Sequence, residues 1–166
     1  MTGKPIYVLD ANVFIESSRR YYAFDLAPAF WQALVHHASN GRLLSIDRVK
    51  QELERGKDDL AHWVDGSFDG WFASTTQDDV LDVYRQIVAW VQRQRQYLDA
   101  AKVGFINGAD GWLIAYAKAK GCGVVTHEQP APDAKRKIPI PSVCRAFNVT
   151  FIDSFAMLRA LGVKLG

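Results

Sequence analysis

Four short apolar runs recur along the chain, at residues 6–9, 43–46, 123–126 and 149–152, and most segments between them have helical periodicity. Runs of this length are typical of buried strands, and helices between them favour parallel pairing of the strands. The pattern therefore predicts an α/β fold, with a mostly parallel central sheet and helices on both of its faces.

The clearest predicted helix begins after residues 76–78 and keeps apolar side chains on one stripe from Val80 to Val91. We expect it to be the longest helix of the fold. Further helices are predicted over residues 24–37, 58–64 and 155–161. Residues 138–147 are predicted to form a short helix or a turn. Gly162 is suited to ending the helix over 155–161.

Length and composition limit what the chain can be. With 166 residues, 49% of them hydrophobic, it can bury one core, and we expect a single domain over residues 1–166. A net charge of +2 is too small to demand a nucleic-acid partner. Cys122 and Cys144 lack metal-ligand spacing, which favours reduced, buried thiols. No long apolar region precedes the first strand, so we expect a cytoplasmic protein without membrane association.

Asp10 ends the first apolar run, and an apolar helix start follows it. Ligands bind at the carboxyl ends of the strands in an open parallel sheet, so Asp10 is a candidate site residue. Its alternative role is that of a turn residue whose side chain accepts hydrogen bonds from the next backbone amides, and Asn12 fits the same role.

Glu52 lies on the apolar face of the helix predicted after residues 43–46. Residues three and four apart on a helix are neighbours, which turns Glu52 inward and Glu54 outward. A buried glutamate is costly without a partner, so Glu52 needs either a metal ion or a salt bridge to Arg48 or Arg145.

Asp110 and Glu128 complete a set of four carboxylates. Asp110 starts a predicted helix, where its alternative role is to cap the helix or complement its dipole. Glu128 follows the third apolar run, and its alternative is a plain surface loop. Carboxylates that converge repel one another unless they are protonated or neutralised, so convergence of the set implies a bound cation. Oxygen ligands select a hard cation such as Mg²⁺ or Mn²⁺.

These carboxylates lie within an ordered set of short motifs, which are VLDANVFIE at 8–16, IDRVKQELE at 46–54, GADGWLIAYAKAKG at 108–121 and VVTHE at 124–128. With these motifs and the segment 135–162, the chain resembles PIN-domain ribonucleases, and most closely the VapC-like toxins of bacterial toxin–antitoxin systems. The resemblance implies a three-layer PIN-like fold and an endoribonuclease, dependent on Mg²⁺ or Mn²⁺, that hydrolyses RNA phosphodiesters.

The resemblance also assigns residues by their positions in these motifs. It implies that the catalytic and metal-binding residues are Asp10, Glu52, Asp110 and Glu128. Glu128 stands where the family usually has a further Asp. Thr126 and Asn12 match polar residues that orient the carboxylates. Glu16 is an additional acid that the sequence leaves open as a ligand, a supporting acid or a surface charge.

The implied chemistry is in-line attack of a metal-activated water on phosphorus, which leaves a 5′-phosphate and a free 3′-hydroxyl. Candidates for contacts with the RNA phosphates, each with a solvated surface charge as its alternative, are Arg19, Arg20, Lys135, Arg136 and Lys137. Tryptophans can stack on bases, although Trp90 and Trp112 are expected in the core.

Family context implies a small cognate antitoxin as a partner, and it suggests a homodimer because related proteins often dimerise. Two other functions are considered. One is a catalytically silent PIN-like module that binds RNA or protein. The other is a doubly wound phosphatase whose strand-ending Asp is a nucleophile, but such enzymes usually carry a second Asp two residues later, where this chain has Asn12.

Overall fold

The computed structural model describes residues 3–165 and is built around one parallel sheet. The five strands of this sheet follow the order β3-β2-β1-β4-β5, and every neighbouring pair is parallel. The strands are β1 (Tyr7–Leu9), β2 (Leu43–Ile46), β3 (Phe72–Ala73), β4 (Gly123–Val125) and β5 (Phe151–Ile152). The α/β architecture with a parallel sheet is therefore confirmed.

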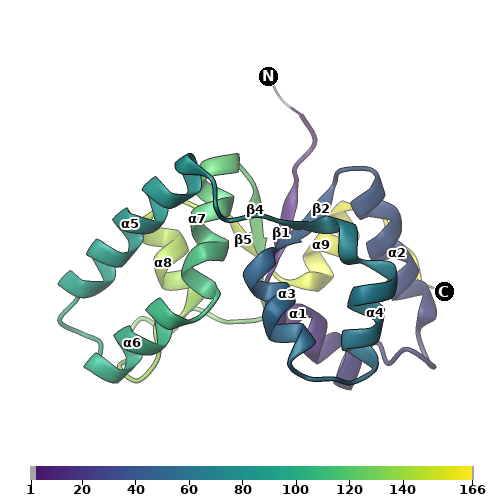
Figure 1. The fold of residues 1–166 in the computed structure, drawn as a ribbon, viewed down its shortest axis with the longest axis horizontal. Coiled ribbons are helices and arrows are strands. Elements are labelled where there is room, and N and C mark those ends of the chain that lie inside the picture. The colour runs from purple at the N-terminus through teal and green to yellow at the C-terminus, as the bar shows by residue number, and fades with distance from the viewer. Residues whose placement is uncertain (1–2, 166) are drawn as a thin grey trace.

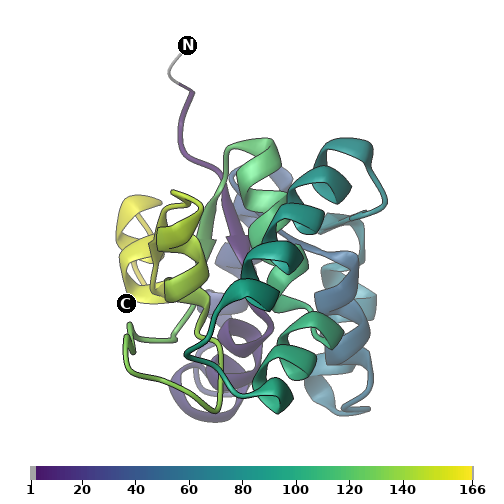
Figure 2. The same ribbon diagram turned by 90° about the vertical axis from the view of Figure 1, so that its left-hand side faces the viewer.

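Helices cover both faces of this sheet. They are α1 (Ala11–Glu16), α2 (Pro28–Ser39), α3 (Asp47–Glu54), α4 (Asp59–Ser67), α5 (Asp78–Arg93), α6 (Asp99–Asn107), α7 (Asp110–Lys120), α8 (Ile140–Ala146) and α9 (Ser154–Ala160). In Figure 1, α1 to α4 gather on one side of the central strands and α5 to α8 on the other. Figure 2, turned by 90°, shows α8 and α9 to the left of the central strands and α5 in front of and to the right of them. Within residues 3–165, no helix is long and apolar enough to cross a membrane.

The predicted strands lie where they were expected, and the longest helix is α5. One strand and one helix were missed. The strand β3 has only two residues, Phe72 and Ala73, which is too short for a recognisable pattern. The helix α6 contains Gly104 and buries only Ala101 and Phe105, so it lacks the apolar stripe that reveals an amphipathic helix.

A π-helical turn, Ser17–Tyr21, extends α1 and was not predicted. The core is built from the three inner strands and the buried stripes of the surrounding helices. Cys122 and Cys144 are both buried thiols, as predicted. Trp112 and Trp90 are half-buried at the edge of the core rather than inside it.

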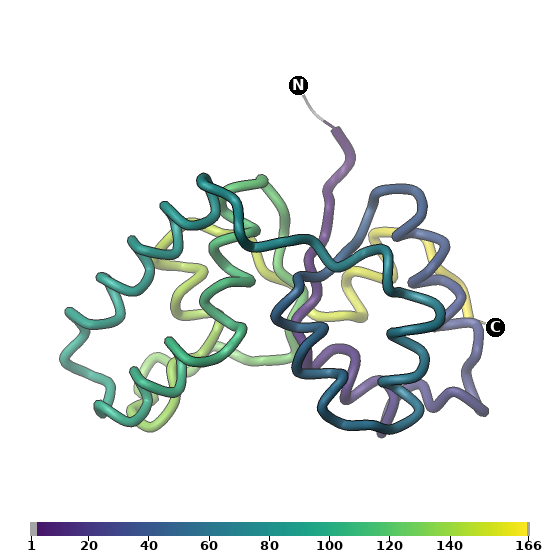
Figure 3. The backbone as a smooth tube through the Cα atoms, in the orientation of Figure 1, coloured from purple at the N-terminus to yellow at the C-terminus, as the bar shows by residue number. Residues whose placement is uncertain are grey.

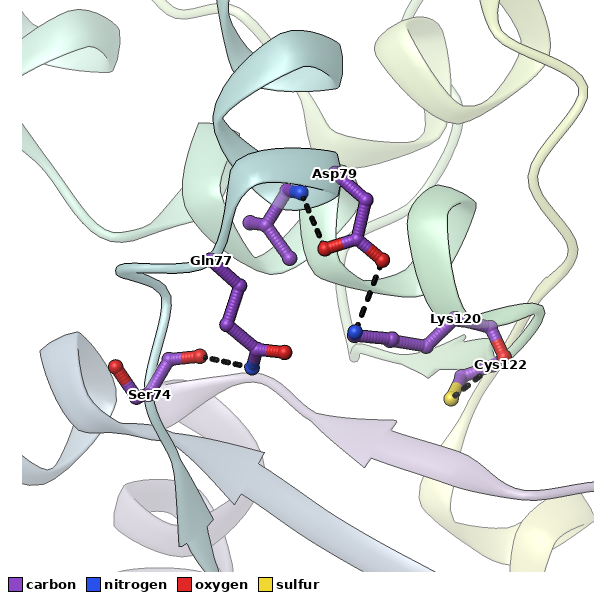
Figure 4. A network of polar contacts seen from close by, with 6 residues as sticks. Ser74, Gln77, Asp79, Lys120 and Cys122 are labelled. Carbon is purple, nitrogen blue, oxygen red and sulfur yellow. Dashed lines mark hydrogen bonds and ion pairs between the residues drawn. The ribbon is translucent and has the colours of Figure 1, made fainter.

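Helices α5 and α7 pack together along one side of the sheet, and an ion pair links the start of one to the end of the other. The Lys120 ammonium lies 2.9 Å from the Asp79 carboxylate, which also accepts a hydrogen bond from the Val80 amide (Figure 4). These groups are largely exposed, so the ion pair contributes little to stability. This end of α7 leads directly into the start of β4, whereas Asp110 begins α7 at its other end.

The long segment between β4 and α8 returns past α6, as the tube in Figure 3 shows. Its path is held by hydrogen bonds rather than by regular structure. The Gln96 side chain donates to the carbonyls of Pro132 and Ala134, and the Leu98 amide donates to the Lys135 carbonyl. This loop brings residues 135–137 to the carboxyl edge of the sheet.

Candidate active site

Asp10 and Thr126 meet at the carboxyl ends of the two adjacent strands β1 and β4. Asp10 follows β1 directly and is only 2% exposed. The Thr126 hydroxyl donates a hydrogen bond of 3.0 Å to the Asp10 carboxylate. Asp10 makes no side-chain capping hydrogen bond to α1, although the backbone amide of Asn12 acts on its carboxylate and lowers its pKa slightly against the larger effect of burial. The predicted contact between a polar residue after β4 and the first carboxylate is present.

Asp110 is the first residue of α7, and its side chain does not cap that helix. Burial, the nearby Glu128 carboxylate and, more weakly, Glu52 raise its pKa from 3.8 to about 7, against a lowering effect of Lys137. Burial also raises the pKa of Asp10 to about 8, with further contributions from Asp110 and Glu128. The four carboxylates therefore influence one another across the end of the sheet.

Glu128 is held in place by three contacts. Its carboxylate accepts a 2.9 Å hydrogen bond from the amide of Ile140, the first residue of α8, and lies 3.2 Å from the Lys137 ammonium. Its own amide donates to the Thr126 hydroxyl over 3.1 Å. With its side chain 14% exposed, Glu128 is not the plain surface residue that the alternative reading describes.

Glu52 is half-buried on α3 and, within residues 3–165, forms no ion pair. The two arginines offered as its partners are engaged with aromatic rings instead. Arg48 lies over Trp112, and Arg145 lies over Phe151. Glu54 is half-buried as well, so burial does not separate the two glutamates as predicted. Their electrostatic neighbours do differ, since Glu52 contributes to the raised pKa of Asp110 and Glu54 to that of Lys50.

The remaining acid and amide at this edge make weaker connections to the cluster. Asn12 is exposed, and its side chain makes no hydrogen bond within the described chain. Glu16 forms an ion pair of 3.1 Å with Arg20 one turn later and is half-buried. Because it also raises the pKa of His127 against the lowering effect of burial, Glu16 lies at the margin of the site.

The basic residues proposed for RNA contacts do not behave alike. Arg19, Lys135 and Arg136 are exposed at the surface. Lys137 is exposed as well, but its ammonium forms an ion pair with the Glu128 carboxylate. Burial lowers the pKa of Lys137, but Glu128, Asp110 and Asp10 together outweigh burial and raise it. This lysine is thus a counter-ion of the acidic cluster, a role that the run of three basic residues does not reveal in sequence.

A small cavity of about 160 Å³ opens beside Asp110, between α6 and the loop carrying Arg136 and Lys137. A larger cavity of about 550 Å³ lies between α2 and α4 and is lined mainly by aromatic and aliphatic groups, including Trp31 and Trp63. No acidic residue lines it. Of these two cavities, only the smaller one adjoins the acidic cluster, through Asp110.

The donor atoms at the strand ends are carboxylate and hydroxyl oxygens, which suit Mg²⁺ or Mn²⁺. Among residues 3–165, however, no three His, Cys, Asp or Glu side chains are grouped closely enough to hold a metal ion as placed. One reason is visible at Glu128, whose carboxylate is drawn to Lys137 and the Ile140 amide. The oxygen ligands of the cluster thus suit a hard cation. As the side chains are placed, however, the Lys137 ammonium neutralises Glu128.

The fold is an α/β fold with a parallel sheet, and carboxylates gather at the carboxyl ends of its strands. The chain belongs to the family described as Domain of unknown function (DUF4411), whose model matches residues 7–165. Among solved structures, it is similar to a chain of VapBC2 from Rickettsia felis, solved bound to a DNA fragment from their promoter, with a TM-score of 0.55. That alignment has 14% identity and covers 89% of this chain and 98% of that chain, so it shows a shared fold. No curated protein matches the chain.

Proposed function

We propose that this protein is a metal-dependent endoribonuclease and the toxin of a toxin–antitoxin pair. The observation that carries the proposal is the mutual effect of the strand-end carboxylates, which together with burial raises the pKa of Asp10 to about 8 and that of Asp110 to about 7. Acids forced together in this way are kept ionised at neutral pH by a cation. A structural salt-bridge network would not need so many acids of one sign.

In this proposal Asp10, Glu52, Asp110 and Glu128 would hold Mg²⁺ or Mn²⁺. The bound ion would neutralise phosphate charge and lower the pKa of a coordinated water. Thr126 orients Asp10 through its 3.0 Å hydrogen bond, and the Ile140 amide orients Glu128 over 2.9 Å. Burial of Asp10 excludes bulk water from that carboxylate, which strengthens its attraction for a cation.

The assignment to a toxin–antitoxin pair has two supports. The ordered motifs resemble those of VapC-like toxins, and the fold is shared with a chain of the VapBC2 complex. A small cognate antitoxin is accordingly proposed as the protein partner, with RNA as the substrate and a cytoplasmic location. The test of this part is the neighbouring gene. We expect it to encode a small protein that cells cannot lose while they retain this protein.

The direct test is to incubate the purified protein with single-stranded RNA and either Mg²⁺ or Mn²⁺. Cleavage is expected with the ions, none with chelator, and a loss of at least about 100-fold in Asp10→Asn and Asp110→Asn, since even residues that only support metal ligands cost about 10- to 100-fold. Asp79→Asn is the matched control, because Asp79 lies in the first turn of α5 and forms its ion pair with Lys120, the last residue of α7, at the opposite end of that helix from Asp110. Equal cleavage by wild type and Asp10→Asn contradicts the assigned mechanism.

A second candidate function is a catalytically silent PIN-like module that binds RNA or a protein partner. The pairing of Glu128 with Lys137 favours it, because an internal ammonium can neutralise the cluster without a metal ion. The two functions differ in metal binding. Calorimetric titration with Mn²⁺ gives saturable binding that is lost in Asp10→Asn if the protein is a nuclease, and gives no binding if it is a silent module.

A further inference from the structure

Arg48, on α3, lies against the aromatic side chain of Trp112 on α7. Its guanidinium carbon lies 4.0 Å from the centre of the Trp112 ring, and Trp112 is stacked on Tyr84 with 3.6 Å between ring centres and 7° between the planes. The stack joins α3 to α7 and α5. We propose that Arg48 is a substrate-binding residue that contacts an RNA phosphate beside the acidic cluster.

The orientation of the guanidinium is fixed by a second contact. Arg48 Nε donates to the Thr75 hydroxyl over 3.2 Å, and that hydroxyl donates to Asp47 over 2.9 Å. Thr75 is 1% exposed, and its amide also donates to Asp47, so this anchor is rigid. Nε therefore points toward the protein, and the two Nη groups are left without a hydrogen-bond partner among the described residues. A guanidinium fixed in this way is prepared to bind a planar or tetrahedral anion through two parallel hydrogen bonds.

The charge of Arg48 has no carboxylate partner. Within the described residues Arg48 forms no ion pair, and its Nη groups donate no hydrogen bond to another residue. The side chain is half-buried, which removes part of its hydration. A positive charge that is oriented, partly desolvated and unpaired is well suited to a ligand phosphate, whereas a purely structural arginine is usually paired.

The position of Arg48 places it at the border of the site. Arg48 and Glu52 are four residues apart on α3, which puts them on one face with about 5–6 Å between their Cβ atoms. Trp112 follows Asp110 by two residues in the first turn of α7. An RNA strand entering a group of four carboxylates is repelled by them, so a fixed cation at the border offsets this repulsion at one phosphate.

The exposed basic residues do not offer the same arrangement. Arg20 is 72% exposed and pairs with Glu16, and Lys137 pairs with Glu128. Arg19, Lys135 and Arg136 form no ion pair within residues 3–165 either, but they are exposed and no side-chain hydrogen bond orients them. Arg48 is thus distinguished by the combination of a fixed orientation and a charge without an ion pair. The inference rests on the proposed function for the identity of the ligand, because the geometry alone specifies a phosphate and the nuclease assignment specifies RNA.

The test measures binding and cleavage separately. Binding of a short fluorescent single-stranded RNA is followed by anisotropy in Mg²⁺, with Asp10→Asn as the parent protein so that the RNA stays intact. Adding Arg48→Gln is expected to weaken binding about 10-fold, as for one good phosphate or base contact, and to reduce the slope of log Kd against log salt concentration by about 0.7. Arg48→Lys keeps the salt slope and recovers part of the affinity, since it retains the charge without the planar fork.

Arg85→Gln is the matched control, because Arg85 is exposed on α5 and pairs only with Asp82. Unchanged affinity and salt slope in Arg48→Gln overturn the inference, and so does an equal loss in Arg85→Gln. If Arg48→Gln unfolds, Arg48→Lys decides: an affinity and a salt slope both equal to those of the parent protein overturn the proposal, because a lysine cannot replace the planar fork without loss. With otherwise wild-type protein, Arg48→Gln should raise KM more than it lowers kcat.

The two proposals fail in different ways. RNA binding that depends on Arg48, together with no cleavage by wild type in Mg²⁺ or Mn²⁺, removes the nuclease function and retains the phosphate contact. Cleavage by wild type that Arg48→Gln leaves unchanged in both KM and kcat retains the nuclease and removes the phosphate contact.

Discussion

The Thr126 hydroxyl and the Asp10 carboxylate lie 3.0 Å apart, although the two residues are 116 positions apart in the sequence. The same hydroxyl accepts a hydrogen bond from the Glu128 amide. Thr126 therefore connects the carboxyl ends of β1 and β4 and fixes two of the four acids at once. Parallel pairing of these strands, with Leu9 opposite Val125, produces the contact.

Replacing Thr126 by valine keeps the shape of the side chain and removes both hydrogen bonds. We expect the free energy of unfolding to fall by about 1–3 kcal/mol, because a buried carboxylate and a buried amide lose a partner. RNA cleavage should fall about 10- to 100-fold, as for other residues that orient metal ligands. Thr126→Ser retains the hydroxyl and should stay close to wild type. Equal cleavage by the valine and serine variants contradicts the orienting role.

In the absence of a metal ion, stability should depend on pH through Asp10 and Asp110. Folding raises the pKa of both, so the folded state binds more protons than the unfolded state above pH 3.8. Their contribution to stability is present below that pH and is lost as the pH rises through about 7 and about 8. In chelator, the melting temperature should therefore decrease as the pH rises from 3.8 to about 8, and it should decrease more steeply in wild type than in Asp10→Asn. Added Mg²⁺ should restore it at high pH.

Periodicity and strand-end position found Asp10, Glu52 and Asp110 because those rules act on neighbouring residues of one element. The inward turn of Glu52 follows from its spacing on α3, and Asp10 follows β1 as any residue at the end of a buried strand would. Glu128 was found by its place after the third apolar run, but its contacts with Ile140 and Lys137 could not be predicted, since they come from a later loop and helix.

The conformation of the segment between β4 and α8 could not be predicted from sequence. It contains no helix or strand, and its path depends on hydrogen bonds from Gln96 to the carbonyls of Pro132 and Ala134. Local patterns carry no information on such contacts. The stack of Arg48 on Trp112 was missed for the same reason, because α3 and α7 are separated by more than fifty residues of chain.

Lys137 neutralises the acidic cluster and should compete with a metal ion for it. An ion pair with one exposed partner contributes about 0.2–1 kcal/mol. Lys137→Met should thus lower the melting temperature in chelator by at most about 2–4 °C. The rise in melting temperature on adding Mn²⁺ should be larger than in wild type, because the carboxylates lose their internal cation. Lys135→Met, which removes an exposed neighbouring charge, is the control. An identical Mn²⁺ response in both variants contradicts competition.

Gly111 lies between Asp110 and Trp112, where a Cβ atom would come within 3.1 Å of the Phe105 ring and 3.2 Å of the Tyr84 ring. Gly111→Ala should lower the free energy of unfolding by about 1–3 kcal/mol through overpacking, and reduce RNA affinity by displacing Tyr84 from Trp112. Gly104→Ala is the matched control, because a Cβ there meets open space on α6 and should stabilise by about 0.5–1 kcal/mol. Calorimetric unfolding of both variants measures the difference, and stabilisation by Gly111→Ala contradicts the close approach of α7 to α5.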